Sequence, residues 1–398
     1  MKIGIYGGTF DPPHLGHMLA AKWVKELLKL DKLILVPDKL PPHKALDDSS
    51  ASPEDRLEMT RLVALAIEPT GSVSVSDCEL LREGKSYTAD TVAQLAAEFP
   101  KDELWVVMGS DMFLTFEQWH APERICAQAG VCGFTRAPGE DAVPLKRQAK
   151  HLQKTYGAKT AVLTLPEDVD VSSTQVRDLL EQGKHEAFVP LLWSPVYGYI
   201  LRHGLYGVSV DLKHLTDEQL RAVSYSMMLP KRIPHVQGTE EEAVKLAQRW
   251  GADVKNARRA AILHDCTKYY TVDEHMALCQ QYDIPLDPIE QGSEKLFHAK
   301  TGAALACHIF GEPKEVQAAI YYHTTGKGNM TTLEKILYLA DYMEPHRDFP
   351  GVEKLRALAY VDLDGAVALG CEMSIAEMEE KGRPVHPNTQ AALDSLRK

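Results

Sequence analysis

The hydrophobic pattern of the chain changes type near its midpoint. Up to about residue 206, short β-branched runs alternate with helical patterns, which is typical of a parallel, doubly wound sheet. From about residue 211, only segments with a helical period remain. A chain of 398 residues also exceeds the size at which one hydrophobic core usually stops growing. We therefore expect two domains, 1–206 and 212–398, joined by a linker at 207–211.

The individual patterns predict the elements of each part. Strands are expected at Lys2–Tyr6, Lys32–Pro37, Val73–Ser76, Leu104–Met108, Gly130–Thr135 and Thr160–Leu165. Helices of the second part are expected at Thr216–Met228, Glu240–Trp250, Lys255–His264, Pro313–His323 and Thr331–Met343. The predicted fold class is a Rossmann-like α/β domain followed by an all-α domain.

Composition excludes several classes of protein. The chain is 44% hydrophobic and 25% charged, as ordinary globular proteins are. It has no run of ~18 apolar residues, its seven scattered cysteines form no C-x-x-C pair, and we expect no secretion signal. We expect a cytoplasmic protein with reduced thiols and no membrane partner. The net charge of −12 argues against binding nucleic acid, whereas small anionic substrates need only a few local cations.

The first predicted strand runs directly into Gly7-Gly8-Thr9-Phe10-Asp11-Pro12-Pro13-His14-Leu15-Gly16-His17. Glycines let backbone N–H groups approach a ligand, and the helix expected after this segment adds the partial positive charge of its N-terminus. A glycine pair or a single histidine can equally be structural. Val171-Ser172-Ser173-Thr174-Gln175-Val176-Arg177 offers further donors and a cation at another helix start, although a capped helix with a surface arginine would look the same.

The whole first string resembles the H-x-G-H nucleotidyltransferase superfamily. This resemblance implies that His14 and His17 contact the phosphates of ATP and stabilise attack on its α-phosphate. The phosphate of the second substrate would attack and pyrophosphate would leave, so catalysis would be mainly positioning and charge stabilisation. Arg177 would contribute a further catalytic cation.

Further matches resemble bacterial nicotinate-mononucleotide adenylyltransferase over residues 1–206. They are Pro41-Pro42-His43-Lys44, Ser86-Tyr87-Thr88-Ala89-Asp90-Thr91, Gly109-Ser110-Asp111, Trp119 and Tyr199-Ile200-Leu201-Arg202-His203-Gly204-Leu205-Tyr206. Ser110 departs from the more usual alanine, a small change. The alternatives are a pantetheine-phosphate or glycerol-phosphate nucleotidyltransferase. Class I aminoacyl-tRNA synthetases share an H-I-G-H-like string, but the chain lacks a K-M-S-K-S-like segment.

The resemblance implies the residues of this first site. The nicotinate ring would lie near Tyr87, Thr88 and Trp119, with backbone amides binding its carboxylate and the indole stacking on it. Asp111 would hold a ribose or the magnesium-nucleotide, with Mg²⁺ accompanying ATP. Arg56 has an alternative interpretation as a surface residue in an i,i+3 ion pair. Phosphates would be met by Gly7, Gly8, Thr9, Phe10, Lys44, Arg56, Ser173 and Thr174.

A second group of chemistry-bearing residues follows the helices of the second part. It consists of His235, His264, Asp265, His298, His323 and Asp341. Imidazoles and carboxylates in this combination suit one or two divalent transition metals. Each histidine alone could instead be a buried, hydrogen-bonded residue.

The order of this group resembles the HD superfamily, and in particular the small bacterial HD proteins that hydrolyse diadenosine tetraphosphate symmetrically to two ADP. The further matches, within a resemblance spanning 212–395, are His323-Thr324-Thr325-Gly326, Ala340 to Arg347 and Lys381-Gly382-Arg383-Pro384-Val385-His386-Pro387. The resemblance implies two metal ions, iron expected and manganese an alternative, bridged by Asp265. Lys268, Thr324, Arg347 and Arg232 would bind the polyphosphate. A nucleotide-sensing regulatory module, or a hydrolase of cyclic nucleotides or deoxynucleotides, is the alternative, and a homo-oligomer is possible.

Overall fold

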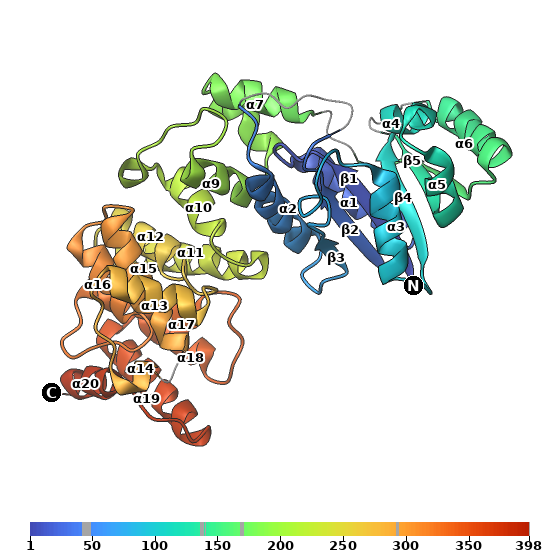
Figure 1. Cartoon of the computed structure of the whole chain (residues 1–398). Coiled ribbons are helices and arrows are strands. Elements are labelled where there is room, and N and C mark those ends of the chain that lie inside the picture. The colour runs from blue at the N-terminus through green and yellow to red at the C-terminus, as the bar shows by residue number, and fades with distance from the viewer. Residues whose placement is uncertain (42–48, 136–138, 140, 168–170, 292–293, 398) are drawn as a thin grey trace. The chain divides into compact units, whose positions relative to one another are not determined.

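The computed structural model describes residues 1–41, 49–135, 139, 141–167, 171–291 and 294–397 (Figure 1). The chain divides into two compact units, Met1–Ser209 and Val210–Lys398. The first unit is α/β and the second is helical.

The first unit contains a six-stranded, wholly parallel sheet in the order β3-β2-β1-β4-β5-β6. Each strand that the sequence predicts is present, so the doubly wound fold class is confirmed. The strands are β1 (Lys2–Gly8), β2 (Lys32–Pro37), β3 (Val73–Val75), β4 (Glu103–Gly109), β5 (Ala129–Phe134) and β6 (Thr160–Leu163).

Both faces of the sheet are buried because successive strand residues point to opposite sides. In β4, Leu104 and Val106 belong to one hydrophobic cluster, and Trp105 and Val107 to the other. The cluster that contains Trp105 is covered by helices α1 (Leu15–Leu27) and α2 (Pro53–Ile67). The cluster that contains Leu104 is covered by α3 (Thr88–Glu98), α4 (Ser110–Leu114), α5 (Pro122–Gln128) and α6 (Val143–Tyr156). The unit continues with α7 (Ser173–Glu181), α8 (His185–Phe188) and α9 (Ser194–His203).

The strand order reverses between β1 and β4, which are hydrogen-bonded neighbours. In open parallel sheets, the loops after two such strands diverge and leave a crevice at their carboxyl ends, where ligands bind. The β1–α1 loop and the start of α4 both follow these strands. The topology therefore places the glycine-rich string and Gly109-Ser110-Asp111 at one edge of the sheet.

The second unit is built from helices packed around a buried centre. They are α10 (Asp217–Tyr225), α11 (Ile233–Trp250), α12 (Val254–Leu263), α13 (Val272–Gln281), α14 (Pro288–Gln291), α15 (Glu294–His308), α16 (Lys314–Tyr322), α17 (Thr332–Met343), α18 (Val352–Ala359), α19 (Leu363–Glu380) and α20 (Pro387–Leu396). Within the residues described for this unit there is no strand, as predicted. At the centre of this unit, α12 and α17 contact each other, and both contact α11 and α16.

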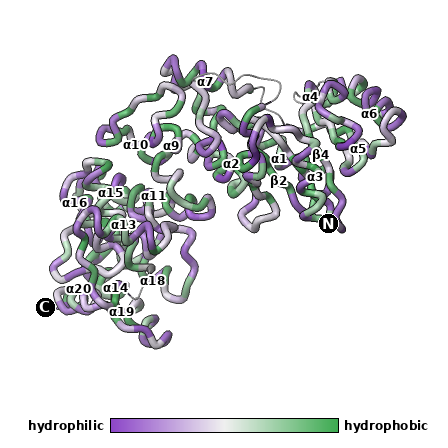
Figure 2. Tube along the Cα trace, viewed as in Figure 1, coloured by the Kyte–Doolittle hydropathy of each residue, from purple (hydrophilic) through white to green (hydrophobic). Residues whose placement is uncertain are grey.

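Local sequence sets where the central helices begin. Thr331 caps α17 by accepting a hydrogen bond from the backbone N–H of Glu334, whose side chain accepts one from Thr331 N–H in return. Apolar residues at helical spacing, such as Ile336, Leu337 and Leu339, are fully buried. Hydrophilic and hydrophobic residues are interspersed along the chain (Figure 2), and none of the described helices has the length and apolar character that a membrane span requires.

Candidate functional site

The two histidines of the first string lie at the start of α1. His14 precedes the helix, and its backbone N–H donates to Nδ1 of His17 over 3.3 Å. In a neutral ring the proton of His17 then sits on Nε2, which becomes a hydrogen-bond donor. The two ring centroids are 3.7 Å apart. The helix start therefore presents an imidazole donor, Nε2 of His17, beside its own amide groups, an arrangement suited to phosphate oxygens.

The glycine-rich turn brings the backbone close to a buried ring. Phe10 has a positive φ of 49° and is buried, with its ring edge-on to His17 at a centroid distance of 5.0 Å. A Cβ on Gly8 would approach this ring to 3.2 Å. Any contact of Phe10 with phosphate must therefore come from its backbone.

Two hydrogen bonds join helix α7 to the β1–α1 loop, although the two segments are far apart in the sequence. Ser173 Oγ donates to the carbonyl of Pro12 over 2.9 Å, and Arg177 Nη1 donates to the carbonyl of Asp11 over 2.7 Å. Arg177 is buried, while Thr174 is exposed. Residues that the sequence analysis treated as two halves of one site thus lie together.

Arg56 is completely buried in α2, so its interpretation as a surface residue is wrong. Its guanidinium donates to the carbonyls of Thr9 and Asp38 over 2.7 Å each, and to those of Lys39 and Ala51 over 3.3 Å. These bonds connect the ends of β1 and β2. The phosphate role of Arg56 stays a prediction, because the side chain already has these partners. Lys44 lies outside the described residues.

The residues that the sequence predicts for nicotinate binding lie at the start of α3 and in and after α4. Tyr87 precedes this helix and Thr88 is its first residue, where amide groups lack intrahelical acceptors. Trp119 is half-buried, 5.4 Å from Phe116 between ring centroids, and Asp111 is exposed in the first turn of α4. The sequence analysis missed His120, whose ring lies 4.3 Å from that of Tyr87. Its position next to Trp119 was the only available signal.

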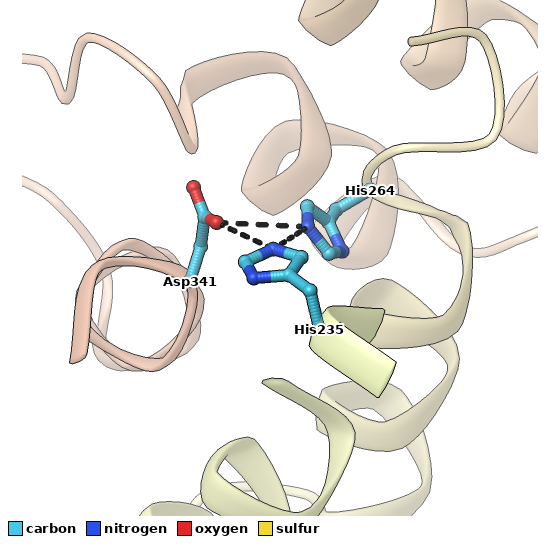
Figure 3. A group of neighbouring side chains, drawn as sticks. All are labelled: His235, His264 and Asp341. Carbon is cyan, nitrogen blue, oxygen red and sulfur yellow. Dashed lines mark hydrogen bonds and ion pairs between the residues drawn. The ribbon is translucent and has the colours of Figure 1, made fainter. Parts of the chain in front are cut away.

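In the second unit, His235 of α11, His264 after α12 and Asp341 of α17 point toward one another (Figure 3). Asp341 Oδ1 lies 2.9 Å from Nε2 of His235 and 3.8 Å from Nε2 of His264. The two Nε2 atoms are 3.4 Å apart. Three helices thus contribute to one cluster.

Asp265, His298 and His323 extend this cluster. Asp265 Oδ2 lies 3.5 Å from Nε2 of His264, while Oδ1 lies 3.1 Å from Nε2 of His298. His298 and His323 approach each other to 3.1 Å between their Nε2 atoms. The two oxygens of Asp265 therefore face different histidines, Oδ2 facing His264 and Oδ1 facing His298. The structure brings all six predicted ligands together, and Asp341 is the one that is partly exposed.

Hydrogen bonds at Nδ1 fix the tautomers of His235, His264 and His323. His264 and His323 direct Nδ1 at the carbonyls of Ala261 and Ile320, each over 2.7 Å, and His235 directs Nδ1 at the Glu344 carboxylate over 3.0 Å. A carbonyl or carboxylate only accepts, so these Nδ1 atoms carry the proton and the Nε2 atoms keep lone pairs. Burial lowers the pKa of both His264 and His323 to about 4, which keeps them neutral near pH 7.

This donor set fits divalent metal ions. The unprotonated Nε2 atoms of His235 and His264 face each other at 3.4 Å, where a shared cation would relieve the repulsion of their lone pairs. His235, His264 and Asp341 offer ligand atoms that all lie within 4.8 Å of one another, as do His264, Asp265 and His323. Burial opposes the ionisation of Asp265, but His264 and His298, which are protonated in the acid range where this carboxylate titrates, and Lys268 hold its pKa well below the usual range. The carboxylate is therefore ionised near pH 7.

Cationic side chains surround the cluster. Arg232 is paired with Asp265 Oδ2, and Lys268 Nζ lies 3.4 Å from Asp265 Oδ1. Arg347 Nη2 donates to Asp341 Oδ1 over 3.0 Å. Thr324 is half-buried next to His323. The predicted phosphate-binding side chains thus border the ligand cluster.

Glu344 is the residue of this site that the sequence analysis missed. It is 1% exposed, and besides His235 its carboxylate accepts hydrogen bonds from the backbone N–H and Nδ1 of His346, over 2.7 and 3.0 Å. Metal-binding histidines commonly donate their second N–H to such a carboxylate. The only sequence signal was its place in the segment from Ala340 to Arg347.

Comparison with known proteins matches each half of the chain to a different family. Residues 5–179 match the cytidylyltransferase-like family and residues 232–346 match the HD domain family. A "Probable nicotinate-nucleotide adenylyltransferase" of Caldicellulosiruptor saccharolyticus is 34% identical over 206 residues, covering 52% of this chain and 99% of the relative. A symmetrical bis(5′-nucleosyl)-tetraphosphatase of Halalkalibacterium halodurans is 41% identical over 166 residues, covering 42% of this chain and 88% of the relative.

A solved structure is also similar to the second half. It is described as a "predicted HD superfamily hydrolase involved in NAD metabolism" from Clostridium acetobutylicum, with 34% identity and a TM-score of 0.45, and the match covers 46% of this chain and 99% of that one.

The two halves are a nucleotidyltransferase domain and an HD domain, and the HD domain carries a cluster of candidate metal ligands. More narrowly, the chain belongs through its N-terminal half to the nicotinate-nucleotide adenylyltransferase family, and its C-terminal half is an HD domain homologous to symmetrical bis(5′-nucleosyl)-tetraphosphatase.

Proposed function

We propose that the first unit transfers AMP from ATP to nicotinate mononucleotide, giving nicotinic acid adenine dinucleotide and pyrophosphate. A phosphate oxygen of the mononucleotide forms the new bond to the α-phosphorus of ATP as the bond to pyrophosphate breaks. The observation that carries this proposal is the meeting of His14, His17 and Arg177 at the β1–α1 loop. These groups donate to the phosphate oxygens as negative charge builds up and moves to the leaving group, with Mg²⁺ accompanying ATP.

Selectivity for the acid form tests this proposal. Amide N–H groups near Thr88 would bind the nicotinate carboxylate, whereas an amide substrate loses a charge-assisted bond worth ~1.5–3 kcal/mol. We expect kcat/KM to favour nicotinate mononucleotide over nicotinamide mononucleotide by at least about tenfold. Equal efficiency would contradict the pocket. Activity only with pantetheine phosphate or glycerol phosphate would favour the alternative transferases.

We propose that the second unit hydrolyses diadenosine tetraphosphate to two ADP. His235, His264, Asp265, His298, His323 and Asp341 would hold two divalent metal ions, with iron expected. When bound, such ions activate water and neutralise charge on phosphate. Water adds across the central P–O–P linkage, one phosphorus gains its oxygen, and the other nucleotide leaves as ADP.

Cations of the chain support a polyphosphate substrate. Arg232, Lys268 and Arg347 border the ligand cluster, and each presents nitrogen donors that suit phosphate oxygens. A regulatory module without hydrolysis is the alternative, and the assembly of all six ligands argues for catalysis.

The test compares substrates on the full-length protein with its metal content quantified. Diadenosine tetraphosphate, cyclic nucleotides and deoxynucleoside triphosphates would each be incubated, and products separated by anion-exchange chromatography. We expect ADP as the sole product from the first and little turnover of the others. Faster turnover of a cyclic nucleotide or deoxynucleotide would replace the proposed substrate, and no turnover by metal-loaded protein would favour the regulatory alternative.

A further inference from the structure

Asp11 is a buried connecting point between distant parts of the first unit. It is 2% exposed, and its Oδ1 accepts hydrogen bonds from the backbone N–H of Ala51 over 3.0 Å and from the hydroxyl of Tyr206 over 2.8 Å. Its carbonyl accepts from Arg177 Nη1 over 2.7 Å, and its Oδ2 lies 3.4 Å from the same nitrogen. One residue of the β1–α1 loop thus connects Arg177 to the end of the unit.

Tyr206 is held firmly in this place. It follows α9, has a positive φ of 57°, and is 4% exposed. Burial and the neighbouring Asp11 carboxylate raise the pKa of the tyrosine well above its ordinary value, so the hydroxyl remains a donor throughout the physiological range. Because the hydroxyl and Ala51 N–H both bind Oδ1, the carboxylate is oriented with Oδ2 toward Arg177.

We propose that Tyr206 is a positioning residue for adenylyl transfer, which orients Arg177 through Asp11. This inference rests on the proposed function of the first unit. Tyr206 does not reach phosphate itself; its hydrogen bond fixes the carboxylate that the guanidinium pairs with. Tyr206 lies within the first unit, which ends at Ser209, so the support of Arg177 comes from the C-terminal segment of that unit.

The test is Tyr206→Phe in the full-length protein, with kcat and both KM values measured by formation of nicotinic acid adenine dinucleotide. The ring keeps its packing while the hydroxyl is lost. We expect kcat to fall about tenfold, within the range for a displaced catalytic group, while KM for nicotinate mononucleotide stays within about twofold. Tyr199→Phe is the matched control, because it removes a similar 2.9 Å hydrogen bond to Asp55 from the same unit. The control should keep its kcat.

A double-mutant cycle separates positioning from a general loss of structure. If Tyr206 acts through Arg177, then Tyr206→Phe should change kcat by less than about twofold in an Arg177→Lys background, because the effects of coupled residues do not add. Fully additive effects would overturn the proposal. So would a Tyr206→Phe enzyme with wild-type kcat.

Two further measurements keep the result interpretable. If Tyr206→Phe does not fold, Asp11→Asn replaces it as the test. The asparagine oxygen can still accept the hydrogen bond from Tyr206, but the negative charge that faces Arg177 is lost. Unchanged kcat in Asp11→Asn would also overturn the proposal. Wild-type protein without adenylyl transfer would instead refute the proposed function of the unit. Hydrolysis of diadenosine tetraphosphate by the variants should equal that of wild type.

Discussion

Replacing Glu344 by glutamine should weaken metal binding in the second unit. The carboxylate accepts N–H groups from His235 and from two positions of His346, and it is almost completely buried. Glutamine keeps one acceptor oxygen and turns the other into a donor that faces an N–H group. Losing one bond to a charged acceptor costs ~1.5–3 kcal/mol. Because ~1.4 kcal/mol is a factor of ten, the affinity for the metal should fall about 10- to 100-fold.

The assay is competition with a chelator of known affinity, followed by metal analysis of the protein. Glu242→Gln is the matched control, because Glu242 lies in α11 like His235 and is 7% exposed. Its carboxylate accepts a 2.6 Å hydrogen bond from the hydroxyl of Tyr360, which is not one of the predicted ligands. Metal affinity should be unchanged in the control. Affinity within about twofold of wild type in Glu344→Gln would refute the role of this carboxylate in orienting His235.

Gly238 offers an independent perturbation of the same contact. A Cβ at this position would lie 2.5 Å from Oε2 of Glu344, so Gly238→Ala must displace the carboxylate. Alanine favours a helix by about 1 kcal/mol over glycine, which by itself would stabilise α11. We therefore expect lower metal affinity, and unchanged affinity in Gly238→Ala would show that the close approach is unimportant.

Three more predictions concern the two units. His17→Ala should lower kcat of adenylyl transfer about 100-fold or more, and near-normal turnover would make His17 merely a helix-end residue. Asp265→Ala should lose at least one metal together with hydrolysis, while adenylyl transfer stays within about twofold; metal retained without hydrolysis would recast Asp265 as an acid–base group. Fragments 1–209 and 210–398 should each fold and keep one activity, and loss of either activity in these fragments would mean that the sites share residues. A shorter first fragment that ends at residue 203 lacks Tyr206 and should have reduced adenylyl transfer.

The sequence by itself determined the two fold classes and the types of residue at each site. Periods of two and of about 3.6 residues are local properties, so strands such as Lys32–Pro37 and helices such as Thr332–Met343 could be predicted from their own residues. The ordered histidines and aspartates indicated a metal site for the same reason: the ligand types are visible in the sequence without any knowledge of distance.

Only the tertiary structure decided which side chains meet and which are buried. Arg56 has the local pattern of a surface ion pair, but it lies on the buried face of α2. There its guanidinium donates hydrogen bonds to four backbone carbonyls. Glu344 reaches His235 across 109 positions of sequence, and Tyr206 reaches Asp11 across 195. Such contacts depend on how whole helices and strands pack, because a local pattern sets the face on which a side chain lies but not the partner that the opposing element presents there.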